Sequence, residues 1–161
     1  MGEATALMAA ADPRQLLAVE AHAPGVTALM RRLEQAGLDN VRIVEGDAVE
    51  VLQALPEQSL QEVRLYFPDP WPKPRHAKRR LLQPGFAALA SEKLAPGGRL
   101  HLATDAQHYV EQALEVLHAW DTRVVDRPQD RPLTGYERRG LAAGRAVVDI
   151  IAVPRDAAAA H

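Results

Sequence analysis

The sequence predicts an α/β protein built on a doubly wound, mostly parallel sheet. Three observations support this fold class: short apolar runs alternate with segments of helical period, Gly or Pro separates many of them, and an acidic residue ends or follows four of the runs. The 161 residues suffice for one domain with a hydrophobic core. We expect that domain to span residues 1–154, followed by a disordered Ala-rich tail at 155–161.

Each element has a local justification. The predicted helices have apolar residues at helical spacing and lie at 3–11, 24–36, 48–55, 81–94 and 106–119. The predicted strands are short apolar runs at 16–20, 41–45, 63–67, 99–103, 122–125 and 146–153. Helix breakers agree with these bounds, because Asp12-Pro13 stops the first helix, Gly37 suits a C-cap and Pro56 ends the third helix. A long polar loop is expected between the last two strands.

Composition excludes several classes of protein. The net charge is −2, so affinity for a nucleic acid must come from a local patch of positive charge. The chain has no Cys, which excludes disulfides and thiolate metal sites. No apolar run approaches the roughly 20 residues of a membrane span, and residues 1–11 lack the basic region of a signal peptide. We therefore expect a soluble cytoplasmic protein with no metal.

Four acidic residues follow or end predicted strands, at the edge where parallel sheets bind ligands. Glu20 is placed to bind the ribose hydroxyls of a nucleotide-like cofactor, although a solvated strand end explains it equally well. Asp47 could accept from an adenine amino group, but on its own it is better explained as the N-cap of the next helix. Asp105 and its neighbour Thr104 have the same two explanations, and Asp69 is the fourth acid.

The stretch FPDPWPKPRHAKRR, residues 67–80, differs from an ordinary loop. Pro68 and Pro70 restrict the backbone on both sides of Asp69, which indicates a stiff loop that pre-organises one carboxylate. A simple Asp-Pro turn is the alternative. Trp71 offers a flat surface on which a base could stack.

Five cationic residues then follow without an acid among them: Lys73, Arg75, Lys78, Arg79 and Arg80. Arg75, Lys78 and Arg79 share one helical face by their spacing. A basic run is usually a solvated face, but this one adjoins the expected ligand crevice. Contact with phosphates is therefore at least as well supported.

The chain resembles the bacterial tRNA (guanine-N7-)-methyltransferase family over nearly its whole length. YFPDPWPKPRHAKRRLLQPGFAALASEKLAPGGRLHLATD resembles the family's highly specific FPDPWPK-RH-KRR element, its KL-PGG turn and its ATD. RPLTGYERRG resembles the family segment T-[KR]-[FY]-E-x-[RK]-G, and the first 26 residues resemble its cofactor loop, first helix and acidic strand end. A generic small-molecule methyltransferase would leave the basic stretch unexplained.

The resemblance implies a Rossmann-like class I methyltransferase fold that uses S-adenosyl-L-methionine to methylate N7 of guanosine 46 in the variable loop of tRNA. By matching position, Asp69 would be catalytic and the cofactor-binding residues would be Gly2, Glu20, Asp47 and Asp69. The substrate-binding residues would be Lys73, Asp105, Thr134, Gly135, Tyr136 and Glu137. The RNA-binding residues would be Arg75, His76, Lys78, Arg79 and Arg80.

The chain departs from the family at its N-terminus. Members carry an N-terminal arm, a first strand and a turn of the type E-[IV]-G-x-G-x-G, and Met1-Gly2 matches only the last two positions of that turn. We therefore expect an N-terminally truncated domain, whose missing strand would lie between those ending at Glu20 and Phe67. A misplaced start or a fragment is favoured over a decayed paralog. A non-catalytic RNA-binding remnant is the alternative function, and both monomer and homodimer stay open.

Overall fold

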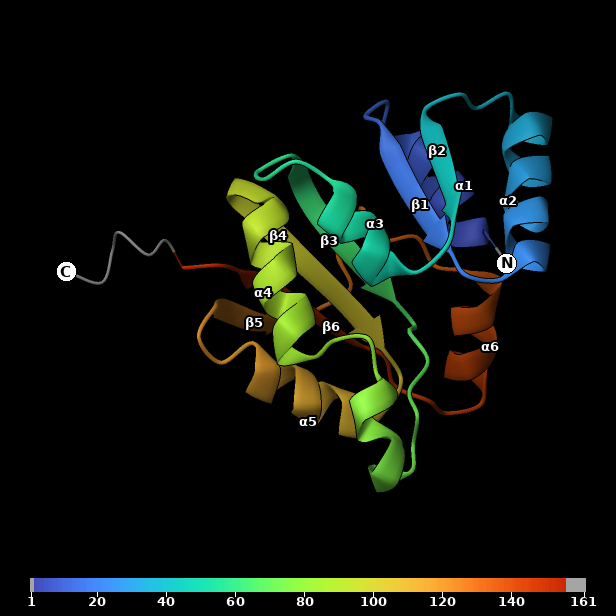
Figure 1. The fold of residues 1–161 in the computed structure, drawn as a ribbon. Coiled ribbons are helices and arrows are strands. Elements are labelled where there is room, and N and C mark those ends of the chain that lie inside the picture. Colours follow the sequence, from blue (N-terminus) through green and yellow to red (C-terminus); the bar gives the residue numbers. More distant parts are fainter. Residues whose placement is uncertain (1, 156–161) are drawn as a thin grey trace. The chain divides into compact units, whose positions relative to one another are not determined.

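The computed structural model describes residues 2–155, and their strands form two separate sheets (Figure 1). The chain divides into two compact units. The first comprises the residues up to Ala54 together with Pro128–Arg139, and the second comprises Leu55–Arg127 together with the residues from Gly140 onward. Of the predicted tail, residues 156–161 lie outside the described part of the chain.

The first unit contains a two-stranded parallel sheet. β1 (Leu16–Glu20) pairs with β2 (Val41–Glu45). The helices of this unit are α1 (Glu3–Ala11), α2 (Ala23–Ala36) and α3 (Ala48–Ala54). The core of the unit joins α1, α2 and β2 through four buried apolar side chains: Ala9, Leu29, Leu33 and Val41.

Two local devices fix where the helices of the first unit end. Gly37 has a φ of 65°, and its N–H donates to the carbonyls of Glu34 and Leu33, so the predicted C-cap of α2 is confirmed. Asn40 is buried, and its side-chain amide donates to the carbonyls of Ala9, Asp12 and Arg14. One amide thereby fastens the chain that leaves α1 beside the start of β2.

The second unit contains a four-stranded sheet in the order β3-β4-β6-β5. β3 (Leu60–Tyr66) runs parallel to β4 (Leu94–Thr104), while β6 (Val148–Val153) runs antiparallel to both β4 and β5 (Asp121–Val125). Helices α4 (Pro84–Lys93) and α5 (Gln107–Val116) lie alongside this sheet (Figure 1). The most deeply buried apolar side chains of the unit include Leu82, Leu100, Leu102, Leu117 and Ile150, all at 0% exposure.

A chain of polar side chains crosses three neighbouring strands of this sheet. His101 on β4 is fully buried, and its Nδ1 lies 2.9 Å from Tyr66 Oη on β3. Its Nε2 lies 2.7 Å from Asp149 Oδ1 on β6. Because each ring nitrogen has a partner, the imidazole is buried without an unsatisfied polar atom. The Tyr66–His101 contact links the strand that leads to Asp69 with the strand that leads to Asp105, and Asp149 extends the link to β6.

The α/β class and its alternation of helices and strands are confirmed, and three details differ. The segment expected to be a long polar loop contains α6 (Gly135–Ala142), so that prediction was wrong. β4 already begins at Leu94 and includes the Pro-Gly-Gly turn predicted to separate a helix from a strand. Residues 74–79 form a short 3₁₀ helix, η1 (Pro74–Arg79). Within residues 2–155, no helix is long and apolar enough to cross a membrane.

Candidate active site

The predicted site residues divide between the two units. Those of the first unit are Gly2, Glu20, Asp47, Thr134, Gly135, Tyr136 and Glu137. Those of the second unit are Asp69, Lys73, Arg75, His76, Lys78, Arg79, Arg80 and Asp105. Within the second unit, the loop carrying Asp69 and the turn carrying Asp105 each follow a strand, as the sequence predicted, and the structure shows that these two strands are parallel neighbours.

The Asp69 loop holds an exposed carboxylate on a strained backbone. Asp69 Oδ1 accepts a hydrogen bond of 3.2 Å from the backbone N–H of Trp71, which is the turn geometry weighed as the alternative. Phe67 and Trp71 have φ values of 51° and 40°, in the left-handed region. For residues other than Gly this region costs about 1–2 kcal/mol each. The backbone of the loop is therefore higher in energy than an extended or right-handed one and needs support from its surroundings.

Arg80 supplies that support, and its predicted contact with RNA stays a prediction. Only 6% of Arg80 is exposed. Its Nε donates to Pro70 O at 2.9 Å and its Nη2 to Trp71 O at 3.1 Å, while Nη1 donates to the side-chain oxygen of Gln112. Hydrogen bonds from a charged donor contribute about 1.5–3 kcal/mol each, enough to offset the strain in the loop. The sequence could not separate Arg80 from its exposed neighbours because all five side chains are positively charged and three of them are arginines.

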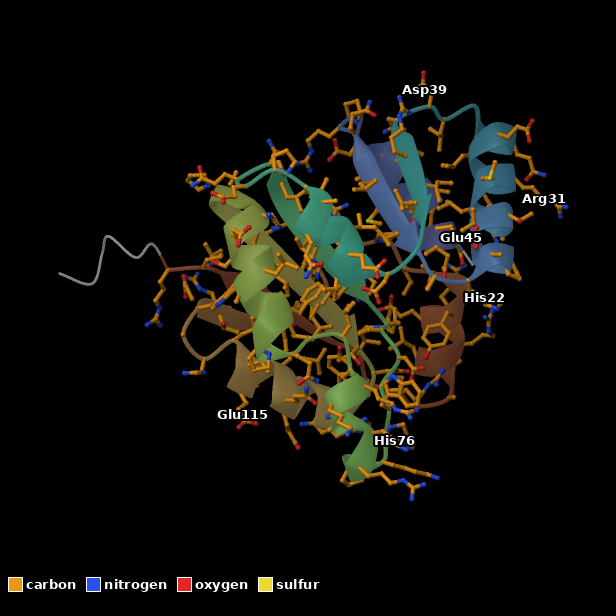
Figure 2. All side chains as sticks on the ribbon, viewed as in Figure 1. His22, Arg31, Asp39, Glu45, His76 and Glu115 are labelled. Atoms are coloured by element: carbon orange, nitrogen blue, oxygen red, sulfur yellow. The ribbon has the colours of Figure 1, made fainter. Side chains whose placement is uncertain are left out.

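The other cations of the stretch are exposed. On η1 and just before it, four cationic side chains are exposed to solvent: Lys73, Arg75, Lys78 and Arg79. The labelled residue His76 marks the position of η1 in Figure 2. The guanidinium of Arg79 lies 4.9 Å from the centre of the Trp71 ring, a cation–π distance. His76 meets the same ring edge-on, with ring centres 5.6 Å apart. These contacts join the aromatic side chain to a surface of concentrated positive charge.

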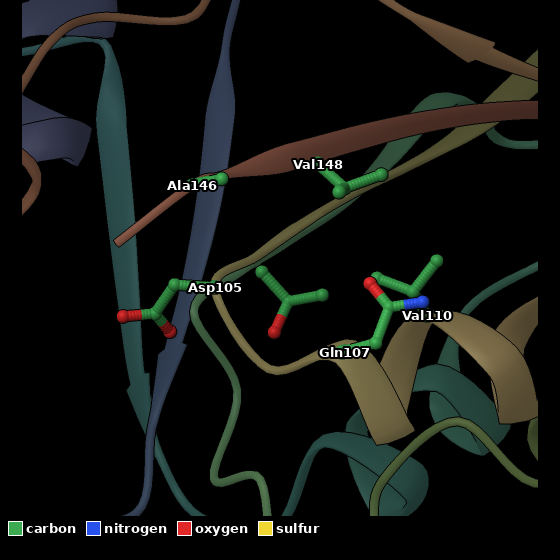
Figure 3. Close-up of a pocket in the computed structure, with 6 residues that line it drawn as sticks. Asp105, Gln107, Val110, Ala146 and Val148 are labelled. Carbon is green, nitrogen blue, oxygen red and sulfur yellow. The ribbon is translucent and has the colours of Figure 1, made fainter. Parts of the chain in front are cut away.

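A small pocket opens beside Asp105 in the second unit. Its volume is about 220 Å³. Figure 3 shows that Asp105 and Gln107 bring polar groups to its lining, while Val110, Ala146 and Val148 bring apolar ones. Asp105 Oδ2 lies 3.4 Å from an Arg145 guanidinium nitrogen.

Neither Thr104 nor Asp105 is the N-cap of α5, which is Ala106 and has no side-chain cap hydrogen bond. Its hydroxyl oxygen accepts a hydrogen bond of 3.1 Å from the backbone N–H of Ala106. The side chain of Thr104 therefore stabilises the turn before α5, while Asp105 is turned to the pocket lining and its ion pair.

Glu20 has a carboxylate that the first unit leaves partly accessible. Its Oε1 accepts from the backbone N–H of His22 at 2.9 Å. Its Oε2 lies only 2.8 Å from the place where a Cβ at Gly25 would stand, so a side chain at that position would displace the carboxylate. A partly exposed carboxylate with one oxygen fixed by the backbone is suited to accept from the hydroxyls of a ribose.

Asp47 caps α3, as the simpler of its two explanations had it. Its Oδ1 accepts from the backbone N–H groups of Val49 at 2.7 Å and Glu50 at 3.3 Å. The side chain stays exposed, and its predicted contact with a cofactor stays a prediction. Gly2 has a φ of 74°, and a Cβ there would stand 2.9 Å from Leu29, so only Gly fits between this turn and α2.

The segment 131–137 is held by an ion pair that the sequence analysis missed. Arg131 is 1% exposed and donates to both carboxylate oxygens of Glu137, at 2.6 and 2.8 Å. Thr134 Oγ1 accepts from the N–H of Glu137, and Gly135 N donates to a Glu3 carboxylate oxygen. The spacing Thr-x-x-Glu at 134–137 is a helix-start signal that would have revealed α6.

The predicted substrate residues of this segment therefore differ in accessibility. Glu137, at 3% exposure, is engaged in its ion pair, whereas Tyr136 is 43% exposed. A direct contact of substrate with Glu137 stays a prediction. Among the described residues, no group of three or more His, Asp or Glu side chains could hold a metal ion.

Comparison with known proteins identifies the family. The model of a family described as "Putative methyltransferase" matches residues 1–150. A tRNA (guanine-N(7)-)-methyltransferase of Nitrosospira multiformis is 50% identical over 159 residues, which cover 94% of this chain and 69% of that protein. The protein of the same name from Halorhodospira halophila is 51% identical over 161 residues, covering 93% of this chain and 69% of its own length.

Solved structures show the same fold at low sequence identity. An rRNA methylase from Streptococcus thermophilus matches with a TM-score of 0.62 and 14% identity, covering 96% of this chain and 81% of that one. A SAM-dependent O-methyltransferase from Thermotoga maritima matches with a TM-score of 0.57 and 18% identity, covering 87% of this chain and 49% of that one. The class I methyltransferase fold is thus confirmed, and the chain belongs to the tRNA (guanine-N7-)-methyltransferase family.

Proposed function

We propose that this chain acts in the S-adenosylmethionine-dependent methylation of guanine N7 in tRNA, at guanosine 46 of the variable loop. Family membership gives the reaction class. The observation that supports the chemistry most directly is the exposed Asp69 carboxylate on its strained loop, in the same stretch as four exposed cations. The position, guanosine 46, is proposed from the family resemblance of the sequence.

The reaction asks little of the protein beyond positioning. Guanine N7 carries a lone pair and no proton, so no general base has to activate it. When bound, S-adenosylmethionine supplies an electrophilic methyl group on a sulfonium. The protein has to hold the base in line for attack, with the reacting atoms about 3–3.5 Å apart.

Asp69 is the residue proposed to hold the guanine. An exposed carboxylate can accept from both the N1–H and the amino group of guanine, which adenine cannot offer in the same pattern. Base selection of this kind contributes about 1–3 kcal/mol. Negative charge on Asp69 also stabilises the cationic base that forms when N7 is methylated.

The exposed cations are proposed to hold the phosphates of the tRNA. Lys73, Arg75, Lys78 and Arg79 concentrate positive charge on a chain whose net charge is −2. Binding that neutralises phosphates releases counterions and weakens as salt rises.

Glu20 is proposed to bind the ribose of the cofactor. Its Oε1 accepts from a backbone N–H, and because Gly25 has no side chain, its Oε2 keeps its place and can accept from a ligand.

The test is transfer of a labelled methyl group from S-adenosylmethionine to a tRNA transcript with guanosine 46, beside the same transcript with adenosine 46. We expect transfer only to the first, and a decrease in transfer of at least a hundredfold in Asp69→Ala with tRNA affinity within about threefold of the parent. Asp126→Ala, an exposed acid in the same unit, is the matched control. An equal decrease in transfer and tRNA affinity in Asp69→Ala would show that Asp69 is structural.

Titration of the cofactor against the chain separates this proposal from the RNA-binding remnant. Binding of S-adenosylmethionine that weakens in Glu20→Ala is expected if the chain is an enzyme. Salt-sensitive tRNA binding without any cofactor binding would instead favour the remnant.

In the methyl-transfer experiment, transfer to both the guanosine 46 and the adenosine 46 transcript would overturn the assignment to position 46. The reaction class would stay in place.

A further inference from the structure

We propose that Arg80 is a positioning residue that orients the Asp69 carboxylate by fixing one peptide group between them. The inference rests on the proposed function for its catalytic consequence, and on hydrogen bonds within the second unit for its geometry. It separates Arg80 from the four exposed cations that precede it in the sequence.

The peptide group that joins Pro70 to Trp71 is held on both sides. Its carbonyl oxygen accepts from Arg80 Nε at 2.9 Å, and His108 Nε2 lies 3.0 Å from the same oxygen. Its N–H donates to Asp69 Oδ1 at 3.2 Å. A rigid, planar peptide transmits orientation from one side to the other. Arg80 and His108 therefore determine where this N–H points, and so where the carboxylate is held.

The next peptide group is held by the same guanidinium. Arg80 Nη2 donates to Trp71 O at 3.1 Å, so the backbone around Trp71 is fixed at two successive carbonyls. Trp71 is one of the two residues of the loop with a positive φ. A left-handed conformation at a bulky residue persists only where the surroundings impose it. The bidentate grip of Arg80 provides such a restraint.

The position of Arg80 is set in turn by α5. Its Nη1 donates to the side-chain oxygen of Gln112 and lies 3.5 Å from His108 O. Its guanidinium carbon lies 5.9 Å from the ring centre of Tyr109, which is fully buried. The hydrogen bonds of Arg80 go to carbonyl and amide oxygens. The guanidinium therefore acts as a donor of several hydrogen bonds in fixed directions. The planar fork of Arg is suited to this role, and the single ammonium of Lys is not.

The deciding variant is Arg80→Lys, which keeps the positive charge and removes the fork. We expect the single-turnover rate of methyl transfer to fall at least tenfold, while the tRNA dissociation constant and its salt dependence stay within about twofold of the parent. In ¹⁵N spectra the Trp71 backbone amide should shift or broaden. Arg123→Lys is the matched control, because Arg123 is an exposed arginine of the same unit, at 73% side-chain exposure.

A second variant keeps the test decisive if Arg80→Lys does not fold. Gln112→Ala removes one acceptor of Arg80 without changing any charge, and we expect a rate decrease of about threefold with the same change at the Trp71 amide. If Arg80→Lys transfers methyl groups at the parental rate and leaves the Trp71 amide unchanged, the proposal is wrong and a phosphate contact explains Arg80 better. A comparable decrease in tRNA affinity and in rate would overturn it as well.

The two proposals fail in different ways. If the parent chain transfers no methyl group to tRNA, the proposed function fails, but the Trp71 amide still reports whether Arg80 holds the loop. If the parent is active and Arg80→Lys is unchanged in both measurements, the positioning role alone is rejected.

Discussion

Two buried arginines hold irregular segments of this protein, and they do so by different physical means. Arg131, in the first unit, faces a carboxylate and forms both hydrogen bonds of a bidentate pair with Glu137. Arg80, in the second unit, grips two backbone carbonyls and an amide side chain. The first arrangement neutralises a buried charge, and the second uses a buried charge to shape a loop. Burial of an arginine therefore does not by itself reveal its role; its acceptors do.

The largest effect should come from breaking the ion pair. Glu137→Ala leaves Arg131 buried without its carboxylate, and such a change typically lowers the free energy of unfolding by about 3–5 kcal/mol. Arg139→Ala, an exposed neighbour on α6, should change it by less than about 0.5 kcal/mol. Urea denaturation measures both. The double variant Arg131→Met with Glu137→Leu should recover much of the stability, and a cost of Glu137→Ala below about 1 kcal/mol would refute the pairing.

The next effect sharpens the contrast with Arg80. Arg80→Met removes several charge-assisted hydrogen bonds but leaves no opposite charge buried alone. Because the hydrogen bonds of one guanidinium are not additive, we expect the free energy of unfolding to fall by about 2–3 kcal/mol, less than for Glu137→Ala. The measurement is a lower denaturant midpoint with an unchanged slope. A larger decrease than for Glu137→Ala would mean that the two arginines do not differ in this way.

A third effect depends on pH and concerns the tyrosine beside Arg80. Burial raises the pKa of Tyr109, although its hydrogen bond with the Leu82 backbone and the charge of Arg80 act the other way. The folded pKa of Tyr109 lies above the unfolded value of about 10. The buried, neutral tyrosine therefore contributes its full stabilisation of the folded state below that pH. This contribution is lost as pH rises through the folded pKa.

Tyr109→Phe tests this sign. At neutral pH the variant should be about 1 kcal/mol less stable, since the N–H of Leu82 loses its acceptor. Between pH 9 and 11, roughly around the tyrosine pKa, the gap between variant and parent should narrow. Thermal or denaturant unfolding across this range provides the measurement, and a gap that widens with pH would contradict the raised pKa.

The smallest effect on stability is expected at the residue next to Arg80. Arg79→Ala should alter the free energy of unfolding by less than about 1 kcal/mol, because the side chain is exposed and loses only its cation–π contact with Trp71. It should nevertheless reduce the slope of log affinity for tRNA against log salt by about 0.7–0.9 for each phosphate that Arg79 neutralises. Arg123→Ala controls for the removal of a surface charge. An unchanged slope would show that Arg79 touches no phosphate.

Much of the fold follows from local patterns. β1 and β2 have the bounds expected from their apolar runs, and Gly37 ends α2 in the left-handed conformation that Gly adopts without steric cost. α6 escaped prediction because its composition is polar, although Thr134 and Glu137 carry the helix-start spacing. β4 begins earlier than expected because its pairing with β3 continues back to Leu94, which lies opposite Leu60. The register of the pair shifts between Leu60 and Glu62, and no local propensity encodes such a shift.

The candidate site divides in the same way. The sequence by itself placed a carboxylate between two prolines, a run of cations after it, and acids at the ends of four strands; composition, turn chemistry and the periodicity of side chains suffice for that. Only the tertiary structure decided that Phe67 and Trp71 take left-handed conformations, that Arg80 turns inward while Arg79 stays in solvent, and that Glu137 is occupied by Arg131. These outcomes depend on which acceptors distant segments bring within about 3 Å of a donor, and such distances exist only after the chain has folded.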